Sequence, residues 1–146
     1  MLTTLTGAQI LVPFFGMMLL TLVVWVFMYI KRLRWFFANP EEGALIRTPE
    51  QLNTIVPEVI NRPSNNLKNL FELPVLFYAA ILLALVLMIQ DGLLVILAWG
   101  FVFFRVLHRV IHCTYNNVNH RFAVYAASCL FLIFLWVRLG TFILMH

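Results

Sequence analysis

The residues of this chain that are best suited to chemistry are polar side chains at the ends of two of its four apolar runs. One set leads into the second run at intervals of three, four and three residues: Arg62, Asn65, Asn69 and Glu72. On a helix these intervals place side chains on one stripe, which here offers a cation, two amides and a carboxylate. A carboxylate in hydrocarbon must be neutral or paired. We therefore interpret Glu72 as part of an internal polar site, and a purely structural bridge to an arginine of the third run is the alternative.

A second polar stripe lies at the far end of the third apolar run and has the same helical spacing: Arg105, His108, His112 and then Tyr115 or Asn116. The second and third helices are expected to be antiparallel, so both polar ends lie at one membrane face and the stripes can face each other. Ionisable residues in membrane segments usually face a bundle interior or a wet cavity. The stripes therefore predict one polar pocket near one face. Arg109 falls off the stripe, and we expect it to reach the lipid headgroups.

His108 and His112 are four residues apart, a spacing at which two histidines can share a metal ion. Zinc normally takes three or four ligands. Only Cys113, His120 and Glu72 are available to complete such a site, and none of them has a recognisable ligand spacing. We therefore predict no metal site.

Composition and hydropathy place both stripes in a membrane protein. Hydrophobic residues make up 63% of the 146 residues, and the mean hydropathy is +0.94, whereas soluble domains are about 45–50% apolar. A bilayer core takes roughly 20 helical residues, so four spans use nearly the whole chain. We predict a single all-α domain over residues 1–146, an integral membrane up-down-up-down four-helix bundle with spans near 8–36, 66–90, 93–113 and 120–145.

The connections between the spans differ in length and polarity. The first is long, and Thr48 followed by Pro49 predicts a short surface helix with a threonine N-cap. The second is a tight turn that ends at Gly92, and the third is polar. Pro74, early in the second span, predicts a bend or a loosened turn that aims Glu72 inward.

The distribution of basic residues predicts the orientation of the chain. Bases cluster in the first connection and flank the third, whereas the second connection, residues 90–92, has none. By the positive-inside rule the first and third connections are cytoplasmic, and both termini lie on the opposite side. The net charge of +4 is explained by this rule and by anionic lipid, so we expect a multi-pass protein that contacts membrane lipid and no nucleic acid.

The assembled pocket contains several cations and amides but a single carboxylate. It suits a small anionic ligand that also carries an ammonium, because guanidinium groups bind carboxylates through paired hydrogen bonds and Glu72 would accept the amine. Apolar helix walls would admit a lipophilic second substrate from the bilayer. This is the chemistry of a peptide-like conjugating thiol that meets a hydrophobic electrophile, and the pocket leaves the identity of the thiol open.

On these residues the chain resembles the MAPEG family (membrane-associated proteins in eicosanoid and glutathione metabolism), and in particular its bacterial members. The resemblance spans nearly the whole chain, and two motifs carry it: Asn69-Leu-Phe-Glu72-Leu-Pro74, and Arg105-Val-Leu-His108-Arg-Val-Ile-His112 with Asn119-His-Arg121. It implies a homotrimer with glutathione between subunits, and we expect the bacterial inner membrane as its location.

The resemblance also implies roles for single residues. Glutathione-binding positions are matched by Asn69, Glu72, Arg105, His112 and, at a second basic position, Arg62. His108 joins them through its place on the stripe. Arg121 matches the arginine that stabilises the thiolate, and Arg34 or Arg32 matches a base that reaches the site of a neighbouring subunit. Two positions depart from the family pattern, which usually has an arginine where Asn65 stands and a tyrosine where His112 stands.

Three functions are compatible with this pattern. The first is a membrane-embedded glutathione transferase or peroxidase in which the charge of Arg121 stabilises the thiolate. The second is a non-catalytic trimeric protein that binds lipid or a partner protein, which the departures at Asn65 and His112 favour. The third is a small proton-coupled transporter that uses Glu72, although the polar residues here cluster at one end of the spans and not at mid-membrane.

Overall fold

The computed structural model describes residues 8–61, 64, 67, 71–115 and 117–145, and within them the regular structure is entirely helical. Its helices are α1 (Ala8–Ala38), α2 (Pro40–Ala44), α3 (Pro49–Ile55), α5 (Leu73–Val86), α6 (Gly92–Cys113) and α7 (Val118–Met145). α1, α6 and α7 are long and apolar enough to cross a membrane. The predicted all-α membrane fold is therefore confirmed at this level.

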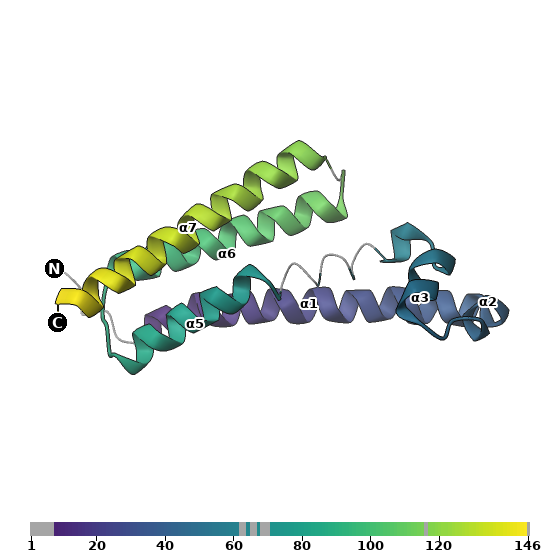
Figure 1. Ribbon diagram of the computed structural model, residues 1–146, viewed down its shortest axis with the longest axis horizontal. Coiled ribbons are helices and arrows are strands. Elements are labelled where there is room, and N and C mark those ends of the chain that lie inside the picture. Colours follow the sequence, from purple (N-terminus) through teal and green to yellow (C-terminus); the bar gives the residue numbers. More distant parts are fainter. Residues whose placement is uncertain (1–7, 62–63, 65–66, 68–70, 116, 146) are drawn as a thin grey trace.

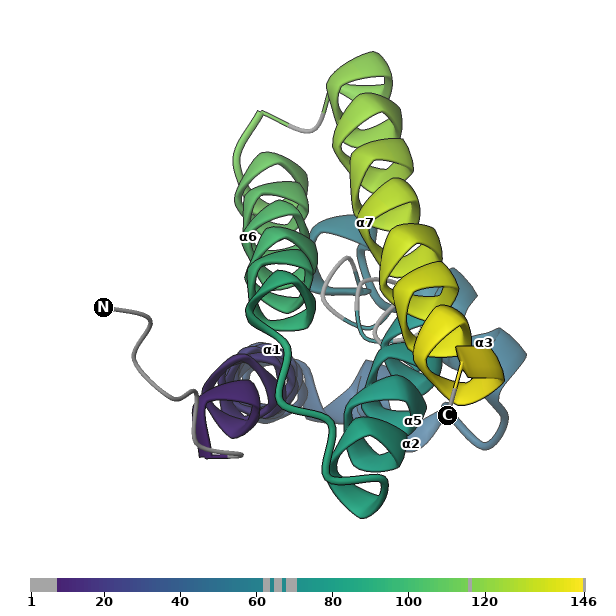
Figure 2. The same ribbon diagram turned by 90° about the vertical axis from the view of Figure 1, so that its left-hand side faces the viewer.

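The long helices alternate in direction. The start of α1, the turn from α5 to α6 and the end of α7 lie at one end of the molecule, which we call the terminal end (Figure 1). Toward the other end lie the connection from α6 to α7 and, farther along, α2 and α3 (Figure 1). We call this side of the molecule the connection end. Seen from the terminal end, α6 and α7 lie side by side, with α1 next to α6 and α5 below α7 (Figure 2). The most extensive packing is between α6 and α7.

The apolar core lies where these helices meet. Phe77 of α5 and Phe101 of α6 are buried and stack with their ring centroids 4.7 Å apart. Gly100 of α6 allows the ring of Phe131 on α7 to approach the α6 backbone. The buried face of α7 follows intervals of four, four, three and four residues: Val124, Ser128, Leu132, Leu135 and Leu139. Ser128 is the polar member of this face, at the half of α7 nearer the connection end.

The second predicted span differs most from expectation. α5 has 14 residues, which is about 21 Å of helix against a hydrocarbon core of roughly 30 Å. Phe71 and Glu72 form a turn before it, and Pro74 occupies an early helical position where its missing N–H is tolerated. The expected loosening near Pro74 is therefore present. The expected inward orientation of Glu72 is wrong for the single chain, because the Glu72 side chain is exposed.

α5 also ends earlier than the sequence predicted. The Met88 N–H donates to the Leu85 carbonyl at 3.0 Å and the Ile89 N–H to the Ala84 carbonyl at 2.9 Å, which is the hydrogen-bond pattern of a Schellman motif. Met88 has φ of 51°, in the left-handed region that favours glycine. The helix therefore ends at Val86, four residues before the predicted end of the span.

The short helices of the first connection follow the sequence signals. Thr48 is the N-cap of α3, where its hydroxyl accepts from the Gln51 N–H and the Gln51 side chain accepts from the Thr48 N–H. Asn61 fastens this region to α1, since its Nδ2 donates to the carbonyls of Leu52 and Val56 and its Oδ1 accepts from Arg32 at 3.4 Å. The predicted surface helix after Thr48 is confirmed.

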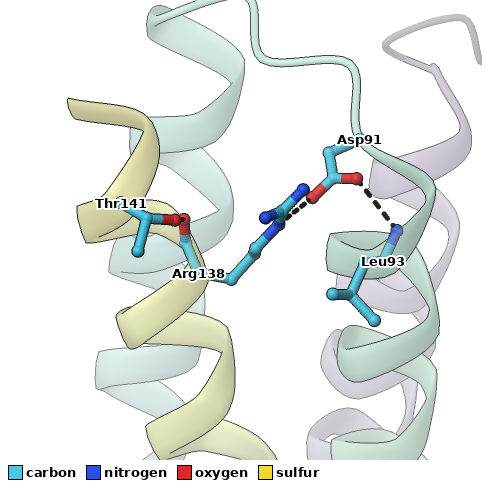
Figure 3. Close-up of polar contacts among 4 residues, drawn as sticks. All are labelled: Asp91, Leu93, Arg138 and Thr141. Carbon is cyan, nitrogen blue, oxygen red and sulfur yellow. Dashed lines mark hydrogen bonds and ion pairs between the residues drawn. The ribbon is translucent and has the colours of Figure 1, made fainter. Parts of the chain in front are cut away.

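An ion pair joins α6 and α7 at the terminal end (Figure 3). Asp91 is the N-cap of α6, and one of its oxygens accepts from the Leu93 N–H at 3.2 Å. Its other oxygen accepts from Arg138 Nε at 2.7 Å. Arg138 also lies over the Phe142 ring, with 4.8 Å from the guanidinium carbon to the ring centroid. Asp91 thus both caps one helix and fixes its neighbour.

Candidate functional site

The polar stripe of α6 is buried. Arg105 is 0% exposed, His108 3% and His112 6%, and they lie in the half of the helix that runs to the connection end. The four-residue interval from His108 to His112 keeps both rings on one side, with centroids 6.3 Å apart. Sequence spacing therefore identified a face of α6 that packs against other helices.

Arg109 belongs to this buried region too. The expectation that it reaches the lipid headgroups is wrong, because its side chain is 3% exposed. The reason lies in the width of the buried face: α6 packs against both α7 and α1, and a residue four positions after Arg105 falls within such a broad face. The cluster therefore contains two buried arginines.

Tyr125 of α7 completes the cluster and was missed in the sequence. Its ring centroid lies 6.1 Å from that of His108 and 5.9 Å from the guanidinium carbon of Arg105. The same guanidinium lies 5.9 Å from the Phe101 ring, so Arg105 is flanked by two aromatic faces, which attract cations. The signal in the sequence was the interval of four residues from Arg121 to Tyr125, which places both on one side of α7.

Arg121 lies in the first turn of α7 and is half-buried. The short connection after α6 brings it back beside the α6 stripe, and the charges of Arg109, Arg105 and Arg121 all act on His108. Asn117 starts this helix, because its Oδ1 accepts from the Asn119 N–H at 3.0 Å and from the His120 N–H at 3.3 Å. The α6 and α7 residues therefore form one basic cluster, which we call the α6–α7 cluster: Arg105, His108, Arg109, His112, Arg121 and Tyr125.

Glu72 lies in a separate pocket of about 460 Å³ between α1 and the start of α5, lined by Met28, Arg32, Ser64, Leu67, Phe71 and Glu72. It occupies the N-cap position of α5 without a side-chain capping bond. Its charge still acts on Arg105 and Tyr125, so the pocket lies near the α6–α7 cluster. Of the two candidate bases at the end of α1, Arg32 lines this pocket, whereas Arg34 is exposed and is not part of it.

The remaining predicted site residues, Arg62, Asn65 and Asn69, lie outside the described residues. Within the described part of the chain, no three His, Cys, Asp or Glu side chains come together as a group that could hold a metal ion. The groups named above at the described site are guanidinium, imidazole, phenol and carboxylate groups.

These observations define a class before they define a family: an integral membrane protein of apolar helices with a buried basic cluster near the connection end. Comparison with protein families then matches residues 10–141 to the MAPEG family, and the chain belongs to this family. The resemblance inferred from the two sequence motifs is confirmed. No curated protein and no solved structure matches the chain.

Proposed function

We propose that this protein is a membrane-embedded glutathione transferase or peroxidase. The observation that carries the proposal is the burial of Arg105, His108 and His112 beside Tyr125, because a basic, hydrogen-bonding cluster under apolar helices binds a small anion in a site with little water. Membership of the MAPEG family, which includes glutathione transferases and peroxidases, supports it.

In this proposal different residues bind different groups of a zwitterionic tripeptide. Arg105 holds a carboxylate, because a buried guanidinium gives strong charge-assisted hydrogen bonds. Glu72 accepts the ammonium, and Arg62, Asn65, Asn69, His108 and His112 supply further hydrogen bonds. Arg34 reaches the site of a neighbouring subunit. The half-buried Arg121 lies beside the thiol and stabilises its thiolate.

The thiolate then reacts with a lipophilic partner that arrives from the bilayer. In the transferase reaction its sulfur forms a bond to an electrophilic carbon, and the electron pair moves to a leaving group or a conjugated acceptor. In the peroxidase reaction its sulfur attacks a hydroperoxide oxygen and releases an alcohol. A second thiol then displaces hydroxide from the sulfenic acid, which gives a disulfide and water.

The assembly is also part of the proposal. α1, α5, α6 and α7 form a four-helix bundle whose three copies make a trimer, as the family resemblance implies. The connection end faces the cytoplasm of a bacterial inner membrane, since the basic residues concentrate there. The exposed apolar side chains of α1, α6 and α7 meet lipid or neighbouring subunits.

The test is the ultraviolet absorbance of the thiolate when purified protein is mixed with glutathione. We expect a thiolate band that is lost in Arg121→Ala and retained in Arg47→Ala, since Arg47 is an exposed arginine of the first connection. Full conjugating activity in Arg121→Ala would contradict the role of Arg121. No band in either the native protein or the control would contradict thiol activation.

The second candidate is a non-catalytic lipid- or partner-binding protein of the same family. The histidine at position 112 favours it, because the glutathione-using members usually have a tyrosine there. It predicts ligand binding without a thiolate band. Glutathione that raises the melting temperature but gives no band would favour this candidate, because a ligand of the native state stabilises by mass action.

A further inference from the structure

One face of α1 runs past two neighbouring cavities. The residues on this face follow intervals of four, three, four, three and four: Phe14, Met18, Thr21, Trp25, Met28 and Arg32. The first four of them line an apolar groove of about 570 Å³ that also includes Leu22, Phe71 and Tyr78. Met28 and Arg32 line the pocket that contains Glu72. This face of α1 therefore runs from an apolar groove to a charged pocket.

Phe71 joins the two cavities, because it lines both of them. From Phe14 to Trp25 the groove follows eleven residue steps of α1, which is about 17 Å of helix, or roughly half of a 30 Å hydrocarbon core. Its volume lies in the range of sites that hold one small ligand. The groove thus has the depth of one leaflet and room for a single acyl chain.

The charged pocket presents two opposite charges to one ligand. Arg32 and Glu72 both line it, and within the described part of the chain they form no ion pair with each other. Arg32 Nε is buried and has no hydrogen-bond partner among the described residues, while its Nη2 contacts Asn61 at 3.4 Å. An ammonium near Glu72 would be attracted to the carboxylate by its opposite charge. An anionic oxygen near Arg32 could accept a hydrogen bond from its Nε–H.

We propose that the groove and the pocket together bind a single-chain zwitterionic amphiphile of the lysophospholipid type. Its chain lies along Phe14, Trp25 and Tyr78, and its headgroup lies between Arg32 and Glu72. This site goes beyond the proposed function, since it needs no thiol and lies between α1 and α5 and not in the α6–α7 cluster. Because glutathione is proposed to use Glu72 as well, the two ligands exclude one another.

The test uses the quenching of tryptophan fluorescence by a brominated acyl chain. Trp25 lines the groove and Trp99 lies outside it on α6, and both are 45% exposed. Two variants each keep one of these tryptophans and replace the other three tryptophans with phenylalanine. They are placed in nanodiscs of unlabelled phosphatidylglycerol, which has no ammonium, and titrated with lysophosphatidylcholine that carries a brominated chain.

We expect saturable quenching of Trp25 at least about fivefold stronger than that of Trp99 at low mole fraction. Glu72→Gln should raise the midpoint about tenfold, and Glu41→Gln, an exposed acid of α2, should not change it. Circular dichroism checks that the variants are folded. Arg32→Gln tests the contact between Arg32 and the anionic oxygen of the headgroup. If the native protein gives no thiolate band with glutathione but shows this quenching, only the proposed function is refuted.

Three results would overturn the amphiphile site. Equal, non-saturating quenching of Trp25 and Trp99 would mean that bulk lipid covers both. Absent quenching of Trp25 would mean that another element, such as a second copy of the chain, covers this face. Equal quenching by brominated diacyl phosphatidylcholine would mean that the occupant is ordinary bilayer lipid.

Discussion

Replacement of Asp91 tests whether one side chain both starts α6 and fastens it to α7. Its two oxygens make separate interactions, one with the Leu93 N–H at 3.2 Å and one with Arg138 Nε at 2.7 Å. An aspartate N-cap is worth about 1 kcal/mol over alanine. The ion pair is partly screened, since the side chains of Arg138 and Asp91 are 40% and 13% exposed, so we assign it about 1 kcal/mol, the upper end for exposed pairs.

Asp91→Ala is therefore expected to lower the free energy of unfolding by about 2 kcal/mol. Asp91→Asn keeps a good N-cap and loses only the charge, so its expected cost is about 1 kcal/mol. Both are measured by titration of detergent-solubilised protein with a denaturing detergent, followed by circular dichroism. The double variant with Arg138→Leu completes a thermodynamic cycle with an expected coupling of about 1 kcal/mol.

Two results would refute this reasoning. Equal costs for Asp91→Asn and Asp91→Ala would mean that the capping bond contributes nothing. Additive costs for Asp91→Ala and Arg138→Leu would mean that the ion pair contributes nothing, even though its geometry is good. The variants separate the two contributions because Asp91→Ala removes both interactions of the carboxylate, whereas Asp91→Asn and Arg138→Leu remove only the ion pair.

The remaining predictions concern backbone geometry and pH. Gly100→Ala places a Cβ that overlaps the Phe131 ring, so we expect a loss of about 1–3 kcal/mol in the same unfolding assay, largely relieved when Phe131→Ala is added. Met88 has a left-handed backbone conformation with φ of 51°. Met88→Gly should therefore raise the free energy of unfolding by about 1 kcal/mol in that assay, and an unchanged value would contradict this prediction. Hydrogen bonds from its own backbone N–H and from Thr48 lower the pKa of Glu50. Its contribution is therefore present above the unfolded pKa and is lost as the pH falls through the folded pKa, so amide exchange of α3 should quicken in acid, and less so in Glu50→Gln.

Helical periodicity was the part of the sequence that predicted structure best. It placed Arg105, His108 and His112 on one buried face, because intervals of three and four residues hold on any regular helix. It failed for Arg109, since the width of a buried face depends on how many helices pack around it. The sequence does not state that α6 has neighbours on two sides.

Local backbone breaks were the hardest feature to predict. Glu72 was placed on a continuous helix, whereas a turn at Phe71 and Glu72 directs it to the pocket with Arg32. Pro74 marked the break but not the side to which the chain turns. Met88 gave no signal at all, because a methionine with positive φ is tolerated only where the surrounding helix end determines it.

The burial of the basic cluster is not explained by stability. Taking a guanidinium out of water costs several kcal/mol, and well-packed apolar residues of similar volume are often as stable or more so. Arg105 is 0% exposed and Arg109 3%, both in a helix whose other buried positions are apolar or aromatic save for two histidines. A fold held only by packing would gain from leucine or methionine at these positions. Ionisable side chains buried in membrane helices usually mark a functional site. The proposed function therefore places its anionic ligand beside these cations of α6, near the connection end.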